Sequence, residues 1–455
     1  MREALRRTLR RRPPLRRLLR NLAQAVQDAG GTVYLVGGYL RNIVEGREPG
    51  DIDLLVTGLS RRRTGDILRS LSIKTPGIRK VVAAGKHFPV HRVAVAWGKE
   101  YIDISNARGD KLPRPKRPGA VPADTTMPGA SLPVPALGHP WPSADDDREA
   151  VDDTSRRDFT INGLLFRLVP GRGVGDGYLL DPFGGIEDLR RKRIRCVGEA
   201  ANRFREDPLR ILRAIRLKNE RHGFVLHPET ASSIRRLGPR LLPATSPDHL
   251  SVELVRSLSA DPAGTIDDLR RLGLLNVLLP ESGPRAKRTA ERIAERYRFL
   301  RRSLGTPLPV PLLLGNLLAD LPLETALAAA RRLRLPDLRS LASVLRRLHI
   351  LTNRDALRFP RAETESALLA TGDTVGCIAL YRAVQRTGNR RAVDLNYFVG
   401  KCRTTPFIIN GIWLEKNGFP EGPRRREILL RIREETLAGK VTRLVDAVRL
   451  AESMR

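Results

Sequence analysis

The sequence predicts an α+β protein: a small mixed sheet domain with covering helices, followed by an elongated all-helical body. Two observations carry this prediction. Up to residue 198, short runs of strand-forming residues alternate with helical segments, and the first of five expected strands is Val33–Val36. From Ala200 onward, apolar residues recur at helical spacing with short polar loops between them. The expected domains are a basic arm (1–20), the sheet domain (21–198), a helical neck (199–275) and a helical body (276–455).

The chain carries a formal net charge of +32 and has an isoelectric point of about 11.2. Such an excess, mostly arginine, favours a polyanionic partner, and nucleic acid is the most common one. An arginine-rich proteome could account for part of it. Aromatic residues make up only 5% of the chain, so contacts to phosphates should outweigh base stacking. Binding should therefore weaken as salt rises.

Residues 1–20 hold nine arginines and one acid, Glu3. They lack the apolar core of a secretory signal, and Pro13-Pro14 should interrupt an amphipathic helix. We interpret them as a basic arm on RNA, with a transit peptide as the alternative. The three cysteines are scattered without a C-x-x-C pair, which fits a reducing cytoplasm. No apolar run is long enough to cross a membrane.

The stretch Val33–Val56 has the pattern of a strand, a glycine turn, a short helix, a loop and a second strand. Gly37 and Gly38 have no Cβ, so the backbone can bend tightly and approach a ligand there. The following helix offers its N-terminal N–H groups to a phosphate, and Arg41 adds positive charge. The simpler interpretation is that a Gly-Gly pair after a strand is only a turn.

Asp51 and Asp53 open the second strand of this stretch. Side chains two apart on a strand point the same way, so the two carboxylates should converge. A carboxylate pair beside a phosphate cradle is what a two-Mg²⁺ phosphoryl-transfer site needs. Asp103, in the expected strand Glu100–Ser105, could become a third carboxylate. The alternative for an Asp-x-Asp at a strand edge is a solvated or capping pair.

Residues 109–150 are rich in proline and then turn acidic. So long a loop inside a domain is either a mobile lid over the site or a disordered insertion. Beyond it we expect a helix beginning at Thr154 and extending to Phe166, then a hairpin, and then a short helix and strand up to Val197. Asn202–Asn219 is expected to be one basic amphipathic helix.

Three segments, in this order, resemble one protein family: GGYLRNIVEGREPGDID, RRDFTINGLLF with DPFGGIEDLRRKRIRCVG, and RFREDPLRILRAIRL. The family is the class II tRNA nucleotidyltransferases and poly(A) polymerases, within the polymerase-β-like nucleotidyltransferases. The resemblance covers roughly residues 30–230. Near the C-terminus, Ile408–Lys440 looks like the tail segment of CCA-adding enzymes.

The resemblance implies roles for individual residues. Asp51 and Asp53 would bind two Mg²⁺ ions, and Asp103 matches a further acidic position of the family. Residues in three motifs would bind the nucleotide: Gly37, Gly38, Arg41, Arg156, Arg157, Asp158, Asn162, Asp207, Arg210 and Arg213. The chain departs from the family at Asn42, where an Asp is usual, and in the length and proline content of residues 109–150.

Asp207 and Arg210 match the family's base-selecting positions, and their chemistry suits that role. Three residues apart on a helix, the two side chains would share a face. An ionised Asp accepts hydrogen bonds and an Arg donates them. Cytosine and adenine present an amino donor beside an unprotonated ring nitrogen, whereas uracil and guanine present a carbonyl beside an N–H. The pair therefore favours C and A. The alternative is local, since an Asp before Pro208 is also a good helix cap.

The implied reaction is template-independent transfer of CMP and AMP from CTP and ATP to the 3′ end of tRNA, with release of pyrophosphate. The alternatives are a poly(A) polymerase, an enzyme that adds only CC or only A, and an inactive homologue that binds RNA. The intact acidic and base-selecting residues argue against an inactive protein. Residues 85–109 have some poly(A) polymerase character, whereas the tail favours the CCA-adding type.

Overall fold

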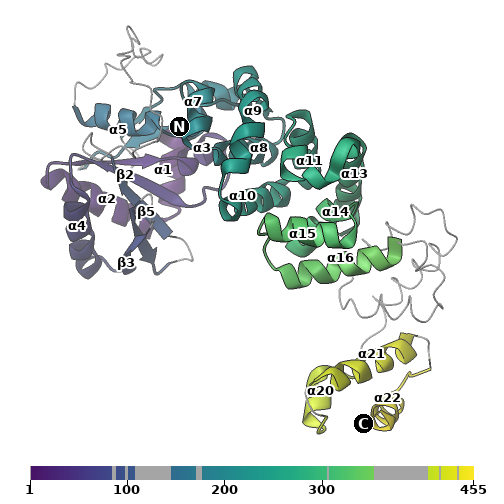
Figure 1. Ribbon diagram of the computed structural model, residues 1–455. Helices are drawn as coiled ribbons and strands as arrows, with labels where there is room; N and C mark the ends of the chain where they lie inside the picture. Colours follow the sequence, from purple (N-terminus) through teal and green to yellow (C-terminus); the bar gives the residue numbers. More distant parts are fainter. Residues whose placement is uncertain are drawn as a thin grey trace. The chain divides into compact units, whose positions relative to one another are not determined.

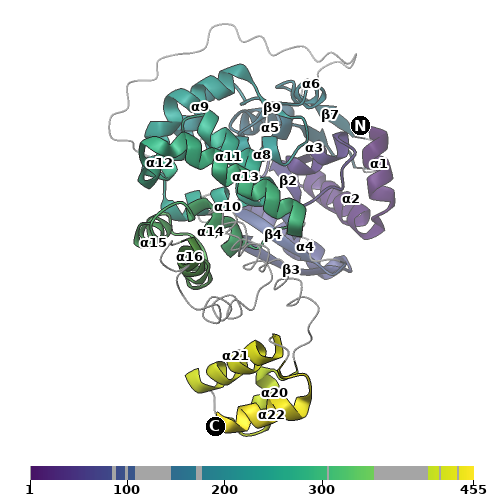
Figure 2. The same ribbon diagram turned by 90° about the vertical axis from the view of Figure 1, so that its right-hand side faces the viewer.

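A computed structural model of the protein describes residues 2–84, 89–97, 101–107, 145–170, 177–304, 307–352, 408–419, 422–437 and 440–454. The chain divides into two compact units, Met1–Leu237 and Gly238–Arg455. Figures 1 and 2 show both units, coloured from purple at the N-terminus to yellow at the C-terminus. The division falls inside the segment 199–275 that the sequence suggests as a neck.

A seven-stranded mixed sheet forms the centre of the first unit (Figure 1). Side by side, its strands are β3 (Ile78–Ala84), β4 (Val90–Val95), β5 (Tyr101–Asn106), β2 (Ile52–Thr57), β1 (Thr32–Val36), β6 (Leu165–Arg167) and β7 (Tyr178–Leu180). Only β2 and β5 are parallel neighbours. The expectation of five strands is wrong, because the predicted hairpin pairs with the free edge of β1 and contributes β6 and β7.

Helices cover both faces of the central strands. They are α1 (Arg2–Arg10), α2 (Pro13–Asp28), α3 (Gly38–Val44), α4 (Arg61–Lys74) and α5 (Asp145–Ser155). The helix α2 contacts β1, α4 contacts β3 and β5, and α5 contacts β2. Ala150 and Val151 of α5 lie in one hydrophobic cluster with Tyr34 and Leu55. Because side chains alternate along β2, Asp53 projects from the same face as Leu55.

The N-terminal residues form packed helices, so the expected basic arm needs correction. The helix α1 buries Leu5 and Leu9 and contacts α2 and α3. The expected interruption at Pro13-Pro14 is confirmed, because α1 ends at Arg10 and Pro13 begins α2. The first turn of a helix does not need the N–H groups that the two prolines lack. The arginines of residues 1–20 are therefore carried on folded helices.

The segment around the predicted loop and helix also differs from expectation. Residues 109–144 lie outside the described residues, whereas Asp145–Ala150, expected in the loop, belong to α5. The predicted helix from Thr154 to Phe166 is wrong: α5 ends, and a turn leads to the 3-10 helix η1 (Thr160–Asn162) and then β6. Phe159 is fully buried and forms a β-bridge with Cys196, so tertiary packing overrides the helical pattern.

The rest of the first unit carries Asp207 and Arg210, the residues expected to select the base. It consists of α6 (Gly185–Arg190), β8 (Arg193–Ile194), α7 (Ala200–Glu206), α8 (Leu209–Asn219), β9 (Val225–Leu226) and the start of α9 (Pro228–Leu241). The strand β8 pairs with β9 in a separate two-stranded sheet, not with the main sheet. The single helix predicted for Asn202–Asn219 is wrong. Asp207 is extended (φ −145°, ψ 99°), as residues before a proline usually are.

The described part of the second unit is helical, as predicted. Its main helices are α10 (Pro247–Ala260), α11 (Pro262–Arg271), α12 (Leu275–Leu278), α13 (Ala286–Leu304), α14 (Val310–Leu318), α15 (Leu323–Arg332) and α16 (Leu338–Thr352). The helix α11 packs against α13, and α16 packs against α14 and α15. No helix within the described ranges combines the length and the apolar composition needed to cross a membrane.

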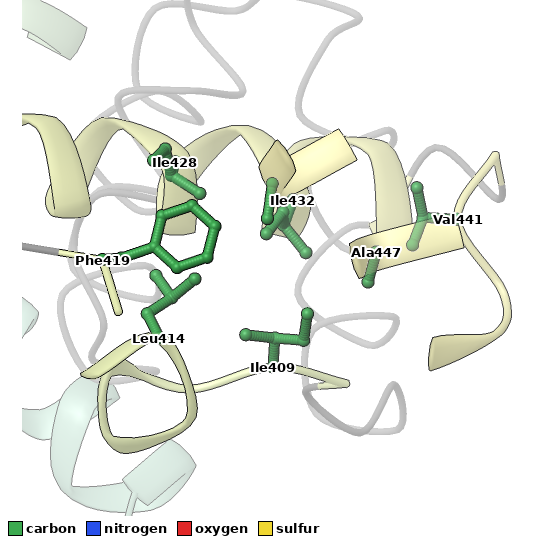
Figure 3. Packing of buried hydrophobic residues seen from close by; sticks show 8 residues of the cluster. Ile409, Leu414, Phe419, Ile428, Ile432, Val441 and Ala447 are labelled. Atoms are coloured by element: carbon green, nitrogen blue, oxygen red, sulfur yellow. The ribbon is translucent and has the colours of Figure 1, made fainter. Parts of the chain in front are cut away.

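The C-terminal residues form a small helical cluster with its own core (Figure 3). It contains α20 (Gly411–Lys416), α21 (Pro423–Leu437) and α22 (Leu444–Ser453). Its buried residues are Ile409, Leu414, Phe419, Ile428, Ile432, Val441, Ala447 and Ala451. The tail segment Ile408–Lys440 thus supplies most of a packed core.

Candidate active site

The turn between β1 and α3 brings a glycine, a carboxylate and a guanidinium together. Val36 lies opposite Asp53 in the β1–β2 pair, and Gly37 follows Val36. Gly37 has φ +73°, and a Cβ there would lie 3.2 Å from Asp53 Oδ2 and 3.1 Å from Arg157 Nη1. Only glycine satisfies both this backbone conformation and this close approach.

Three acidic residues lie near the start of β2. Asp53 faces Asp103 across the parallel pair β2–β5. Burial raises the pKa of Asp53 to about 6; the charge of Arg157 opposes this shift, and the charges of Asp103 and Asp51 add to it. Asp51 is exposed and precedes β2, so strand alternation does not fix its side chain as expected. The two predicted metal ligands, Asp51 and Asp53, are near enough for their charges to interact, but Asp51 is exposed and Asp53 is partly buried.

Asp103 is beside Asp53, but an arginine holds its carboxylate. Arg92 on β4 lies opposite Asp103 on β5. Arg92 Nε donates to Asp103 Oδ1 at 2.8 Å, and Arg92 Nη2 donates to Asp103 Oδ2 at 2.7 Å. This paired geometry is the strongest that an arginine makes with a carboxylate. In this arrangement both oxygens of Asp103 are engaged by Arg92.

The acidic residues still suit a magnesium ion. Within the described ranges, no group of three or more His, Cys, Asp or Glu side chains is arranged to hold a metal. Mg²⁺ prefers oxygen ligands and is commonly bound through one or two carboxylates together with substrate phosphates. Asp51 and Asp53 supply such oxygens, and the repulsion that raises the pKa of Asp53 would be relieved by a cation. These two residues therefore fit the ion.

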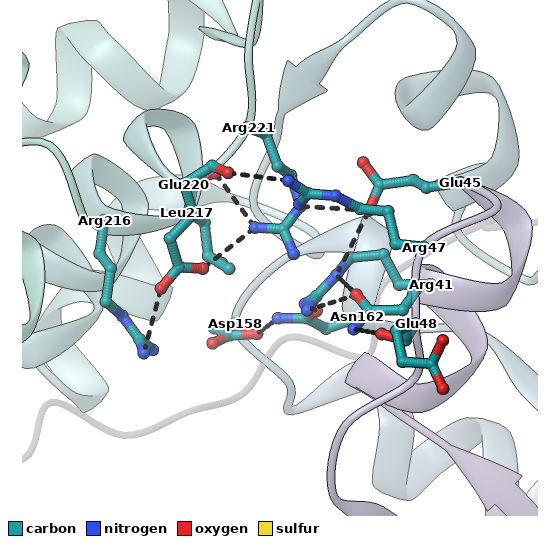
Figure 4. Close-up of polar contacts among 11 residues, drawn as sticks. Arg41, Glu45, Arg47, Glu48, Asp158, Asn162, Arg216, Leu217, Glu220 and Arg221 are labelled. Atoms are coloured by element: carbon teal, nitrogen blue, oxygen red, sulfur yellow. Dashed lines mark hydrogen bonds and ion pairs between the residues drawn. The ribbon is translucent and has the colours of Figure 1, made fainter. Parts of the chain in front are cut away.

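Four of the predicted nucleotide-binding residues form one chain of contacts. Figure 4 shows three of them, Arg41, Asn162 and Asp158. Arg41 on α3 donates from Nη1 to Asn162 Oδ1 on η1. Asn162 Nδ2 donates to Asp158 Oδ1 at 2.9 Å, and Asp158 Oδ2 lies 3.8 Å from Arg213 Nη1 on α8. The glycine-turn helix α3 is thereby linked to α8, the helix that contains Arg210.

Arg41 lies in surroundings that suit an anion. Its side chain is only 11% exposed. Burial lowers the pKa of Arg41 to about 10, and the charge of Arg221 acts in the same direction. The guanidinium remains protonated at neutral pH, so a buried positive charge stands at the glycine turn. A polyphosphate would compensate that charge.

The turn Arg156-Arg157 connects the carboxylates to the base-selecting motif. Arg157 Nη1 donates to Asn162 O at 3.4 Å. Arg156 is exposed, and its carbonyl oxygen accepts from Arg210 Nη2 at 2.8 Å. Arg210 Nη1 also donates to Glu206 Oε2 at 2.9 Å. The guanidinium of Arg210 is thus held next to the turn whose second residue, Arg157, acts on the pKa of Asp53 through its charge.

Asp207 makes the local hydrogen bond that a capping residue makes. Its Oδ1 accepts from Leu209 N at 3.1 Å, and its carbonyl oxygen accepts from Arg210 N at 3.1 Å. Because Asp207 precedes α8, it shares no helical face with Arg210, and that part of the sequence argument is corrected. A turn brings the two residues together instead.

Sequence reasoning missed three charged residues in this region: Glu45, Arg92 and Arg221. Arg92 could have been found from the opposite charges in the two strand patterns HRVAV and YIDIS, since oppositely charged residues pair across strands. No local pattern relates Glu45 to Arg221, which are 176 residues apart.

Two protein-family models match this chain. The family model described as "Poly A polymerase head domain" matches residues 33–195, and the one described as "Probable RNA and SrmB- binding site of polymerase A" matches residues 223–283. The chain belongs to the class II nucleotidyltransferase and poly(A) polymerase family. The head model spans β1 to β8 and contains all three acidic residues.

Relatives named as CCA-adding enzymes and relatives named as poly(A) polymerases both match this chain. The CCA-adding enzyme of Geobacillus stearothermophilus is 31% identical over 277 residues, or 61% of this chain and 57% of that enzyme. Poly(A) polymerase I of Salmonella typhi is 31% identical over 256 residues, or 56% of this chain and 48% of that enzyme. The chain thus spans about half the length of the relatives it matches.

Solved structures of the family share the fold over nearly the whole chain. The structure of the Thermotoga maritima CCA-adding enzyme complexed with tRNA covers 96% of this chain and 95% of its own, with a TM-score of 0.63 and 22% sequence identity. At this identity the likeness supports the fold: a sheet head followed by a largely helical region.

Proposed function

We propose that this chain adds CMP and AMP from CTP and ATP to the 3′ end of tRNA without a template. One observation carries the proposal. Arg210 of the expected base-selecting pair donates to the carbonyl oxygen of Arg156. A Cβ on Gly37 would lie 3.1 Å from Nη1 of the next residue, Arg157, and 3.2 Å from Asp53 Oδ2, so the side chains of Arg157 and Asp53 both border the glycine turn. Base choice and phosphoryl transfer can therefore occur on one bound nucleotide.

Asp51 and Asp53 would hold two Mg²⁺ ions. When bound, these ions lower the pKa of the RNA 3′-hydroxyl and neutralise charge on the phosphates. The 3′-hydroxyl gives its proton to water and its oxygen bonds to the α-phosphorus of the nucleotide. The bond from that phosphorus to the bridging oxygen breaks, and pyrophosphate leaves. Arg41 and Arg157 bind and orient the phosphates through charge-assisted hydrogen bonds. Catalysis by the protein is thus positioning and electrostatics.

Base choice falls to Asp207 and Arg210. The turn that joins them places an acceptor and a donor within three residues. A cytosine or adenine edge can donate its amino hydrogen to the Asp and accept at its ring nitrogen from the Arg. Uracil and guanine would leave both side chains with mismatched partners, which costs binding energy.

RNA binding would fall mainly to arginine contacts with phosphates, given the net charge of +32. The packed core of the C-terminal cluster supports a role of this tail in tRNA binding, because a cluster with its own core can present a preformed surface. The three cysteines are scattered without a C-x-x-C pair, which fits a reducing compartment and supports a cytoplasmic location.

Poly(A) addition is the second candidate function. The relative from Salmonella typhi named as a poly(A) polymerase is as similar, at 31% identity, as the CCA-adding enzyme. The head motifs cannot separate the two activities, because both use the same chemistry. An enzyme that adds only CC or only A shares the same motifs.

Defined RNA substrates test the proposal. Transcripts of one tRNA that end at the discriminator base, at C or at CC are incubated with CTP, ATP or both. Growth to CCA, or to a defined part of it, is the expected result, and a transcript already ending in CCA should stay unchanged. An unstructured RNA of equal length serves as the control. Long A tails on both RNAs would establish the poly(A) activity instead.

A further inference from the structure

A buried charge network joins α3 to the C-terminal end of α8 (Figure 4). Arg221, whose side chain is 3% exposed, donates from Nε to Glu45 Oε2 at 3.3 Å. Arg221 Nη1 also donates to Leu217 O and to Glu220 Oε2, each at 3.2 Å. Neither Arg221 nor Glu45 belongs to the predicted nucleotide-binding residues. Their network links α3, the helix after the glycine turn, to the end of α8, the helix that contains Arg210.

Glu45 has two arginines within reach, and they compete for it. Arg41 and Glu45 are four residues apart on α3, a spacing at which helix side chains form ion pairs. The same oxygen, Glu45 Oε2, lies 3.9 Å from Arg41 Nε but 3.3 Å from Arg221 Nε. The carboxylate of Glu45 is therefore closer to Arg221, in the turn that follows α8, than to Arg41 of α3.

The position of Glu45 decides where Arg41 is directed. With Glu45 held by Arg221, Arg41 donates to Asn162 and to the neutral oxygen of Asn42. If Glu45 closed onto Arg41, the full charge of the carboxylate would compete with a bound triphosphate for the same guanidinium. Burial and the charge of Arg221 lower the pKa of Arg41, and the carboxylates of Glu45, Glu220 and Asp158 offset this only in part, so an added anion would still be favourable.

We infer that Arg221 is a positioning residue for the nucleotide: it holds Glu45 toward α8, so that Arg41 stays directed at Asn162 and open to the triphosphate. The inference rests on the proposed nucleotide transfer and adds a residue outside the nucleotide-binding set. Its competitor is a simple tether, in which Arg221 only fixes α3 to α8. Arg47 Nη2, which donates to Glu220 O at 3.2 Å, joins the same two segments.

Two substitutions in the full-length chain separate steering from tethering. In Arg221→Met, Glu45 loses its partner and closes onto Arg41. The KM for ATP and CTP should rise about tenfold while kcat changes little, because ground-state and transition-state binding weaken together. In the double variant Arg221→Met/Glu45→Gln, the competing charge is gone, and KM should return to within about threefold of the wild type. A tether would stay broken in the double variant.

Matched controls complete the design. Arg296 is a similarly buried arginine of the second unit, paired with Asp320 at 2.9 Å. Arg296→Met should lower thermal stability as Arg221→Met does, but should leave nucleotide KM unchanged. The single variant Glu45→Gln completes a double-mutant cycle with the wild type, Arg221→Met and the double variant. If Arg221→Met does not fold, Arg221→Gln removes the charge and keeps a hydrogen-bond donor, and the same rise and rescue are expected.

Equilibrium binding of ATP without RNA keeps this test separate from the proposed function. A wild type that binds ATP but transfers nothing to tRNA would refute the proposed reaction, while the four variants could still be compared by their ATP affinities. An unchanged affinity in Arg221→Met overturns the inference. A weakened affinity that Glu45→Gln does not restore overturns it as well, in favour of the tether.

Discussion

Gly37 leaves the space that Asp53 occupies: a Cβ on this glycine would lie 3.2 Å from Asp53 Oδ2. Gly37→Ala should therefore displace the carboxylate and strain a backbone with φ +73° and ψ −144°, at a cost of about 1–3 kcal/mol. A displacement of this kind should slow nucleotide addition by about a hundredfold. Gly30→Ala is the control, because Gly30 also has positive φ (+86°) but nothing within 4 Å of its Cβ position. Equal activity losses in both variants would show that strain, not crowding, is responsible.

Removing a metal-binding carboxylate should stop the reaction without unfolding the protein. Asp51→Ala and Asp53→Ala should each lower the rate at least about a thousandfold, since the metal supplies several kcal/mol of stabilisation. Thermal stability should hold or rise, because one of several mutually repelling charges is gone. Primer extension and a melting curve check both outcomes. Substantial activity with Mg²⁺ in either variant would remove that residue from the site.

The raised pKa of Asp53 predicts how the stability of the metal-free protein depends on pH. The carboxyl loses its proton at about 3.8 when unfolded but at about 6 when folded. Between these values the folded state binds more protons, so stability falls as pH rises through this window. Asp53→Asn should remove this decline. Melting temperatures from pH 4 to 7 in EDTA test it, and parallel profiles for the two proteins would contradict the shift.

Asp147 holds α5 to the sheet through a buried hydrogen-bond network. Its fully buried carboxylate accepts from Tyr34 at 2.6 Å, Tyr178 at 2.9 Å and Arg167 at 3.2 Å. Burial, with the nearby Asp147 carboxylate, raises the pKa of both tyrosines, so they remain donors. Asp147→Ala should cost about 3–5 kcal/mol of stability, because Arg167 loses its charged partner.

The control for this network is Asp152→Ala, on the exposed side of the same helix. It should change stability by no more than about 0.5 kcal/mol. Urea unfolding followed by circular dichroism measures both variants. A small effect of Asp147→Ala would mean that the hydroxyl donors find other partners.

Asp207→Asn separates base selection from helix capping. Asn is as good a cap as Asp, so the bond from Leu209 N and the stability should persist. The amide presents a donor as well as an acceptor, so UTP and GTP should compete at least about tenfold better. Arg210→Ala should relax selection in the same direction. Single-nucleotide addition in mixtures reads the ratio, and unchanged selectivity in both variants would leave Asp207 with its capping role alone.

Local sequence was sufficient for much of the site. The order strand, glycine turn, helix and strand followed from residues 33–56, because every contact in that pattern is between near neighbours in the chain. The break at Asp207-Pro208 was also readable, since a residue before proline avoids the helical region. The error came from letting a long amphipathic pattern outweigh one local signal.

The features that sequence did not predict depend on distant residues. Pairing between Arg92 and Asp103 required the register of β4 against β5, and pairing of Glu45 with Arg221 required the packing of α3 near α8. The hairpin β6–β7 was expected, but its pairing with β1 depends on tertiary contacts between residues far apart in the chain. Roles for Asp51, Asp53 and the nucleotide-binding residues remain predictions that the variants above can test.

Both flanks of residues 108–144 are fastened to the head independently of each other. On one side, Asn106 Nδ2 donates to Leu59 O at 2.9 Å and to Thr64 Oγ1 at 2.8 Å. On the other, Asp147 is bound to Tyr34 in the core. Asn106 ends β5 and Asp147 lies in the first turn of α5, so each is bonded to described residues of the first unit. The end of β5 and the start of α5 therefore each have an attachment of their own to this unit.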